Sequence, residues 1–165
     1  MSASQIQMDP ALPPRESWAD INDDCPIFQS LGVLSTRSAF LVLREAFYGA
    51  TRFDQFAQRA DISEPVAAAR LKELTEAGLL EKHPYREPGQ RTRNEYVLTD
   101  KGADLLPTLL ALFRWGERWV FGDGIRADIA HASCGASVDA VVTCEHGHRV
   151  PPGELRFRRN PARAS

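Results

Sequence analysis

Two short amphipathic segments separated by a tight break constrain the fold of this chain more than any other feature. The first, residues 51–60, opens with a Thr-x-x-Asp cap and repeats apolar residues at helical spacing. The second, residues 63–78, begins with a serine cap and a first-turn proline and ends at a glycine, and its spacing points Ala67, Leu71 and Leu74 inward. Two short helices joined by a turn of about four residues form a helix-turn-helix, so the sequence predicts that motif here.

Two further helices are predicted before this motif. Residues 25–32 are typical of a short helix with a proline in its first turn, where the missing N–H costs nothing. Residues 35–49 carry one apolar stripe, with Ser35 or Thr36 as the cap and Gly49 as the stop.

After residue 78 the apolar period changes to two. Residues 79–85 and 93–99 alternate apolar and polar side chains, and Pro88-Gly89 marks a turn between them. We interpret the pair as a β-hairpin. A hairpin directly after a helix-turn-helix is a wing.

A final long helix is predicted from the Thr99-Asp100 cap to about residue 120, with a kink near its start at Pro107. It carries two neighbouring apolar stripes, and a domain of this size covers only one of them with its own core. We therefore expect a second copy of the chain to cover the other. The predicted fold is mainly α (α+β): a winged helix-turn-helix with a long C-terminal dimerisation helix and room for a small C-terminal hairpin.

Composition limits the remaining choices. With 165 residues and 43% hydrophobic content, the chain can bury one ordinary core. We predict a flexible segment at 1–24, the DNA-binding and dimerisation domain at 25–121, and an extension at 122–165 that ends in a basic tail. The prolines and charges of both ends favour solvated termini, and contact between the acidic head and the basic tail is the alternative. No secretory signal and no apolar run of about 18 residues is present, which favours a cytoplasmic protein without a membrane partner.

Several local motifs narrow the winged-helix assignment. Cys25-Pro26, Gly49-x-x-Arg52-Phe53, Leu71-x-x-Leu74-x-x-x-Gly78-Leu79, Tyr96-x-Leu98-Thr99-x-x-Gly102 and Trp115-Gly116 lie in the expected order. Together they resemble the HxlR-type bacterial regulators over about residues 25–120. The chain departs from that pattern before the second helix, where Gly-Lys-Trp is absent, and at Pro65 and Ala68. The resemblance implies a DNA-binding transcriptional regulator.

The expected DNA contacts come from three elements. The 63–77 helix would enter the major groove of a pseudo-palindromic operator, its N-terminus on a phosphate and its apolar residues on thymine methyls. The wing holds four basic residues against Glu87 between positions 82 and 93 and would grip the backbone or minor groove. The candidate residues are Arg52, Ser63, Pro65, Val66, Ala69, Arg70, Lys72, Arg86, Arg91 and Arg93.

The alternative is a winged-helix interaction module that has lost specific DNA binding. The donor-poor stretch 65–69 and the net charge of −2 motivate it, and the basic hairpin would then be a solvated face. An enzyme is not expected, because the chain lacks a glycine-rich phosphate loop, a nucleophile elbow and a His-Glu-x-x-His motif.

Two groups of cysteine and histidine remain. Cys25, at a helix start that favours thiolate, is a candidate oxidant sensor, and the alternative is a small packed residue. His131, Cys134, Cys144 and His148 (or His146) are a candidate zinc set, although the second knuckle is degraded and a plain hairpin is the alternative. No cofactor is required, and a small-molecule or oxidant effector would regulate DNA binding.

Overall fold

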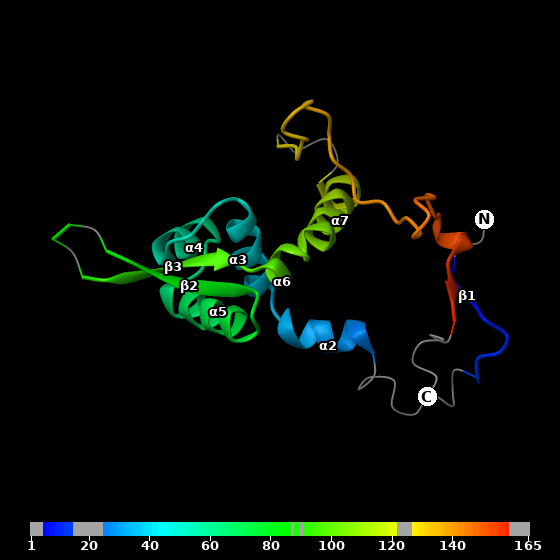
Figure 1. The fold of residues 1–165 in the computed structure, drawn as a ribbon, viewed down its shortest axis with the longest axis horizontal. Coiled ribbons are helices and arrows are strands. Elements are labelled where there is room, and N and C mark those ends of the chain that lie inside the picture. Colours follow the sequence, from blue (N-terminus) through cyan, green and yellow to red (C-terminus); the bar gives the residue numbers. More distant parts are fainter. Residues whose placement is uncertain (1–4, 15–24, 87, 90, 122–126, 159–165) are drawn as a thin grey trace. The chain divides into compact units, whose positions relative to one another are not determined.

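The computed structural model describes residues 5–14, 25–86, 88–89, 91–121 and 127–158 (Figure 1). The chain divides into two compact units. One is Pro26–Asp139, and the other combines Met1–Cys25 with Ala140–Ser165. Each unit is considered by itself.

Three helices form the centre of the first unit: α3 (Arg37–Phe47), α4 (Phe53–Arg59) and α5 (Glu64–Glu76). Thr36 caps α3, its hydroxyl accepting the Ala39 N–H at 3.2 Å, as the sequence predicts. The inward positions predicted for α5 are also confirmed, since they are at most 1% exposed. The largest fully buried side chains are Phe56, Leu43, Leu71, Leu74, Leu80 and Val42.

The start of α4 differs from the sequence prediction. Thr51 does not cap the helix; Arg52 is the N-cap residue instead. The Gln55 side-chain oxygen accepts the N–H groups of Thr51 and Arg52 at 3.0 and 3.1 Å. A side chain inside the helix thus satisfies the donors that precede it, so the predicted Thr51 cap is wrong.

The turn between α4 and α5 depends on one unusual backbone conformation. Asp61 has φ of 51°, in the left-handed region that aspartate tolerates better than most residues. The N–H of Ile62 then returns to the Ala57 carbonyl at 3.1 Å, and Ser63 becomes the N-cap of α5. The predicted break at residues 61–62 is confirmed as a helix-turn-helix turn.

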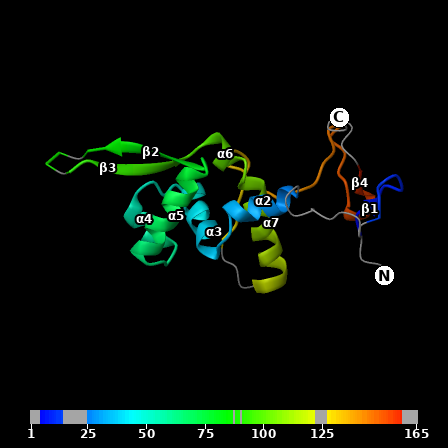
Figure 2. The same cartoon turned by 90° about the horizontal axis from the view of Figure 1, so that it is seen from below.

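The predicted wing is also confirmed. Strands β2 (Leu80–Tyr85) and β3 (Arg93–Leu98) pair antiparallel, from Leu80 opposite Leu98 to Tyr85 opposite Arg93. Gly89 in the connecting loop has φ of 77°. The hairpin projects beyond α4 and α5 in both views (Figures 1 and 2).

The short helix α6 (Asp100–Ala103) fastens the wing to the end of α5. The Thr99 hydroxyl donates to the Gly78 carbonyl at 2.6 Å and accepts the Gly102 N–H at 3.1 Å. Lys101 donates to the Ala77 carbonyl at 2.7 Å. A Cβ on Gly102 would lie 2.2 Å from the Leu79 carbonyl oxygen, so this close approach requires glycine.

The predicted final helix is broken near its start. After α6 the chain makes a turn at Asp104–Leu105, where the Asp104 N–H bonds to the Asp100 carbonyl and the Leu105 N–H to the Gly102 carbonyl. It continues as α7 (Leu106–Gly116), followed by a π-helical turn, η2 (Glu117–Phe121). Pro107 lies in the first turn of α7 and lacks the N–H that a continuous helix would need. The kink predicted near Pro107 is therefore confirmed, and it appears as a turn between two separate helices.

The first helix of this unit, α2 (Pro26–Val33), is confirmed and differs from the others in its burial. None of its eight residues is buried. No single described helix is long and apolar enough to cross a membrane; α2 and α3 meet that test only jointly, across a bend of 79°.

Residues 127–139 close the first unit along α7. The Arg114 side chain on α7 donates to the backbone carbonyls of Ile129 and Val138 and pairs with Asp128 and Glu117. Instead of a regular hairpin, an isolated bridge joins Ala130 and Ser137.

The second unit joins the two ends of the described chain. Strand β1 (Gln7–Met8) pairs in parallel with β4 (Arg156–Phe157), which follows the 3-10 turn η4 (Pro152–Glu154). The sequence favours solvated termini, whereas these residues are paired. Residues 15–24 of the predicted flexible segment lie outside the described residues.

Candidate nucleic-acid interface

The exposed side of α5 carries most of the predicted base-contacting residues. Ser63, Pro65 and Lys72 are exposed, Val66 is 38% exposed and Ala69 is half-buried. The Ser63 side chain makes no capping hydrogen bond, so its hydroxyl is not committed to the helix end. The side chain of Lys72 is 70% exposed and lies 3.8 Å from Glu76. Pro65, Val66 and Ala69 give the N-terminal half of the helix a small apolar surface, and Lys72 lies in the C-terminal half.

Arg70 is oriented differently from its neighbours. Its guanidinium donates to the Thr36 hydroxyl at 3.2 Å and pairs with Glu73 at 2.6 Å, and the side chain is 18% exposed. Arg70, predicted to contact a base edge or a phosphate, is therefore engaged with the start of α3. To reach DNA it would have to give up both contacts. Sequence reasoning missed Thr36 as its partner, because the two residues are 34 positions apart.

The charge of α5 is a second feature that sequence reasoning missed. Between Glu64 and Glu76 the helix has two basic residues, Arg70 and Lys72, against the three acidic residues Glu64, Glu73 and Glu76, which gives a net charge of −1. Such a helix gains little from the electrostatic attraction of phosphates. Attraction to a nucleic acid must come mainly from the neighbouring wing.

The positive charge of the wing lies at its outer end, since Leu80–Leu98 as a whole has four basic residues against Glu81, Glu87 and Glu95, a net charge of +1. Arg86, Arg91 and Arg93 are exposed at the outer end of the hairpin, where it projects beyond the helices (Figure 1). Lys82, nearer the body, lies with its Nζ atom 5.7 Å from the centre of the Tyr96 ring. The three arginines can therefore contact a backbone or a groove at a distance from α5.

Arg52 connects the start of α4 to the wing. Its guanidinium carbon lies 5.0 Å from the centre of the Tyr85 ring, and its backbone bridges to Glu95 of β3. Tyr96, next to Glu95 in β3, packs edge-on against Phe56, and burial raises the pKa of its phenol. The stacked Arg52–Tyr85 pair thus fixes the wing against α4 and leaves an arginine between the two elements. Tyr85 was not predicted to take part.

The cysteine and histidine candidates are divided between the two units. Cys25 directly precedes α2 and is half-buried. His131 Nδ1 lies 3.1 Å from Cys134 Sγ in the first unit, whereas Cys144 and His148 belong to the second unit. Among the described residues no group of three such side chains is positioned to hold a metal ion. The oxidant sensor and the zinc set stay predictions.

Comparison with known proteins gives a consistent result. A profile of the HxlR-like helix-turn-helix family matches residues 33–123. Rv3095 of Mycobacterium tuberculosis (strain ATCC 25618 / H37Rv), named an uncharacterized HTH-type transcriptional regulator, is 34% identical over 119 residues, or 72% of this chain and 74% of that protein.

Two solved structures of candidate transcription factors also match. PA1607 superposes with a TM-score of 0.74 at 31% identity and covers 85% of this chain and 98% of its own. PA1374 of Pseudomonas aeruginosa gives a TM-score of 0.61 at 33% identity, over 85% and 95% of the two chains. The family and these relatives are transcriptional regulators rather than enzymes. The helix-turn-helix, the wing and these matches together mean that this chain belongs to the HxlR-like helix-turn-helix family of transcriptional regulators.

Proposed function

We propose that the chain is a cytoplasmic homodimer that recognises a pseudo-palindromic operator in double-stranded DNA. Each subunit would insert the N-terminal half of α5 into the major groove and set its wing on the flanking backbone or minor groove. Half-sites would lie about one helical turn, roughly 34 Å, apart. The single observation that carries the DNA contact is the set of exposed arginines Arg86, Arg91 and Arg93 at the outer end of the wing.

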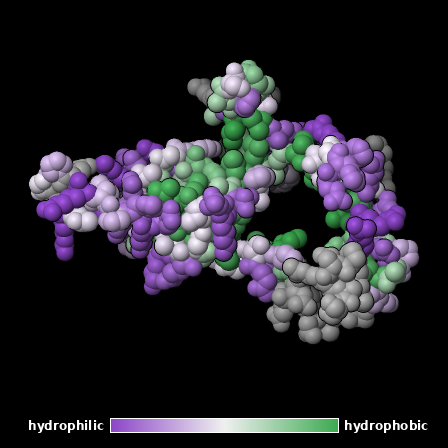
Figure 3. Space-filling view, viewed as in Figure 1, coloured by the Kyte–Doolittle hydropathy of each residue, from purple (hydrophilic) through white to green (hydrophobic). Residues whose placement is uncertain are grey.

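Exposed apolar side chains support the dimer. Ile27 and Phe28 of α2 are 72% and 52% exposed, and Trp119 and Phe121 of η2 are 70% and 67% exposed. Apolar surface gathers along α7 in the space-filling view (Figure 3). Contiguous apolar surface of this kind marks an interaction site, and a second copy is the common partner.

Two observations favour the alternative of an interaction module without specific DNA binding. The net charge of α5 is −1, and the Arg70 guanidinium is engaged with Thr36 and Glu73. A module of this kind would bind duplex DNA weakly and with little dependence on salt, because it would neutralise few phosphates.

The first experiment selects DNA from a random duplex pool with the full-length protein and sequences the retained fraction. A regulator enriches a sequence with two inverted half-sites. The affinity for that sequence, measured by fluorescence anisotropy between 50 and 200 mM salt, should fall steeply. Weak binding without an enriched sequence would instead support the interaction module.

The second experiment tests the wing. In the double variant Arg91→Ala/Arg93→Ala we expect the affinity to fall about tenfold and the slope of log K against log salt to lose about two units. The matched control, Arg149→Ala/Arg158→Ala, removes the same charge from exposed positions in the other unit. If both doubles lose the same affinity, or neither does, the assignment of the wing is wrong.

A further inference from the structure

The unit Pro26–Asp139 contains a pocket between α3 and α7 that none of the predicted contacts uses. Its volume is about 530 Å³. Small-molecule sites commonly occupy about 300–1,000 Å³ and are lined mainly by apolar and aromatic side chains. The lining here includes Phe40, Phe47, Leu109, Phe113, Phe121 and Ile129. The pocket therefore has the size and the lining of a binding site.

The charged residues at this pocket neutralise each other. Glu45 has a side chain only 7% exposed and pairs with Arg44 at 2.5 Å. Glu117 pairs with Arg114 at 2.9 Å. Each charged side chain that lines the pocket therefore has an opposite charge beside it. A charged ligand would lose its hydration without gaining a partner, so an uncharged ligand is favoured.

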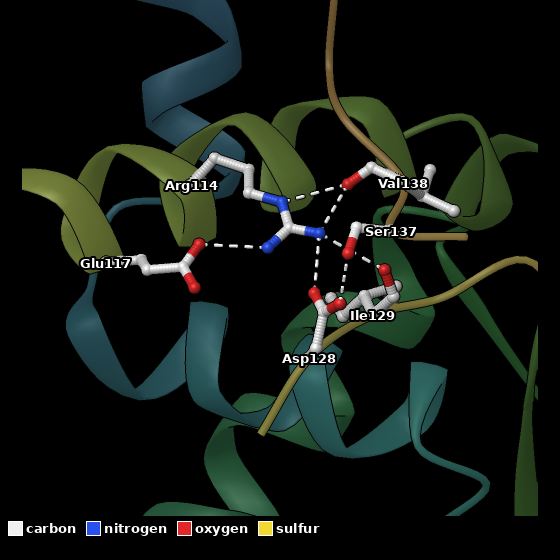
Figure 4. A network of polar contacts seen from close by, with 6 residues as sticks. All are labelled: Arg114, Glu117, Asp128, Ile129, Ser137 and Val138. Carbon is white, nitrogen blue, oxygen red and sulfur yellow. Dashed lines mark hydrogen bonds and ion pairs between the residues drawn. The ribbon is translucent and has the colours of Figure 1, made fainter. Parts of the chain in front are cut away.

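One wall of the pocket comes from the extension after α7. Ile129 lines the pocket, and its carbonyl accepts a hydrogen bond from Arg114 Nη2 at 3.1 Å. Figure 4 shows the guanidinium of Arg114 reaching from α7 to the two chain segments that carry Ile129 and Val138. The carboxylate of Asp128 pairs with the same nitrogen at 2.7 Å. Hydrogen bonds to Glu117 and then Asp128 raise the pKa of Arg114, whose guanidinium stays charged. We call the contacts of Arg114 with residues 128–138 the clamp.

The pocket and the apolar surface assigned to the dimer overlap only in part. No residue of α2 lines the pocket, nor do the exposed Trp115, Trp119 and Val120. The wall that contains Ile129 is supplied by the chain itself. A partly open, concave site with one wall from the chain's own extension favours a small molecule over a protein segment.

We infer that this pocket binds a small, uncharged, predominantly apolar molecule, aromatic or aliphatic. The helix α3 on one side also packs against α5, and α7 on the other side carries the apolar surface of the proposed dimer. A bound molecule would thus contact both elements, and any effect on DNA affinity rests on the proposed function. Binding itself does not, so it is measured without DNA.

The probe is N-phenyl-1-naphthylamine, an uncharged aromatic dye whose fluorescence rises in apolar surroundings. Titration of the full-length protein should give a saturable signal with one site per chain. Gly116 lines the pocket on α7, and a Cβ there has no atom within 4 Å, so Gly116→Leu should fill the pocket without a clash. We expect the Kd for the dye to rise about tenfold in this variant.

Two further variants keep the test decisive. Ala111→Leu is the matched control, because it adds similar bulk at an exposed position of α7 outside the lining. It should bind the dye like the unmodified protein. Leu112→Glu puts a carboxylate at a lining position that is 53% exposed, so it should weaken dye binding while the fold persists. Circular dichroism verifies the fold of each variant.

The inference fails if binding is not saturable, or if Gly116→Leu and Leu112→Glu, once shown to be folded, bind the dye like Ala111→Leu. Sedimentation with and without dye tests the other occupant. If the dye binds only as the oligomer dissociates, a second copy fills the pocket and the small-molecule site is wrong. Loss of DNA binding with intact dye binding would contradict the proposed function alone.

Discussion

Similar apolar side chains are buried in the helix-turn-helix centre and exposed in the two flanking elements, α2 and the α7–η2 segment. In α3, α4 and α5, Val42, Phe56 and Leu71 have 0% of their surface exposed. In α2 and the α7–η2 segment, Ile27 and Trp119 are 72% and 70% exposed. The side chains of the first set are buried by their own chain alone. The second set stays in contact with solvent until another molecule covers it, so the centre provides the fold and the flanks are the proposed association surface.

The sharpest test of this difference compares one substitution in both regions. Leu71→Ala removes a fully buried side chain and should lower the free energy of unfolding by about 3 kcal/mol, because it leaves a cavity. Leu31→Ala, at a position 54% exposed, should lower it by less than about 0.5 kcal/mol in dilute protein, yet weaken self-association. Urea unfolding and sedimentation equilibrium over a range of concentrations measure the two effects.

Equal losses of stability would show that α2 belongs to the same cooperative core. Unchanged association of Leu31→Ala would contradict the assignment of the dimer surface to α2.

The next largest effect is expected at the junction of the regions. Gly102→Ala places a Cβ 2.2 Å from the Leu79 carbonyl oxygen, so the backbone must shift. Overpacking of this kind costs about 2 kcal/mol. Gly116→Ala is the matched control, since its Cβ would have open space. Thermal unfolding should separate the two, and a stable Gly102→Ala protein would mean that α6 is not fixed to the end of α5.

The smallest expected effect is a pH dependence of the clamp, the contacts that hold residues 128–138 to Arg114. The Ser137 hydroxyl and then Arg114 lower the pKa of Asp128 from its ordinary 3.8. A carboxyl with a lowered pKa stabilises the folded segment fully above that ordinary value, and the stabilisation is lost as pH falls through the folded pKa. Amide exchange of Val138, whose N–H bonds to the Ile129 carbonyl, should lose protection in that acidic range. Asp128→Asn should make its protection independent of pH there; a persistent dependence would point to another group.

The sequence predicts the locally determined parts of this fold well. Apolar spacing identifies the inward residues of α5, and caps and glycines give the limits of α3 and of the hairpin within about a residue. The Leu98-Thr99-x-x-Gly102 motif, used as a mark of resemblance, has a physical cause in the contacts that Thr99 and Gly102 make with Gly78 and Leu79.

Features that depend on distant residues could not be predicted. The Arg70 contact to Thr36 spans 34 positions, and the Arg114 contact to Val138 spans 24. The pairing of β1 with β4 joins opposite ends of the chain. Local periodicity carries no information about such contacts, so the outward direction predicted for Arg70 could not reveal its engagement with Thr36.

The turn at Asp104–Leu105 has a mechanical consequence for the proposed dimer. It separates α6, which is fastened to α5 and the wing, from α7, which carries the proposed dimer surface. Because α7 also packs against α3 of the same unit, the turn is held from both sides. In the proposed dimer, the distance between the two reading heads, and with it the half-site spacing, would therefore depend on how firmly two residues far from the DNA hold this turn.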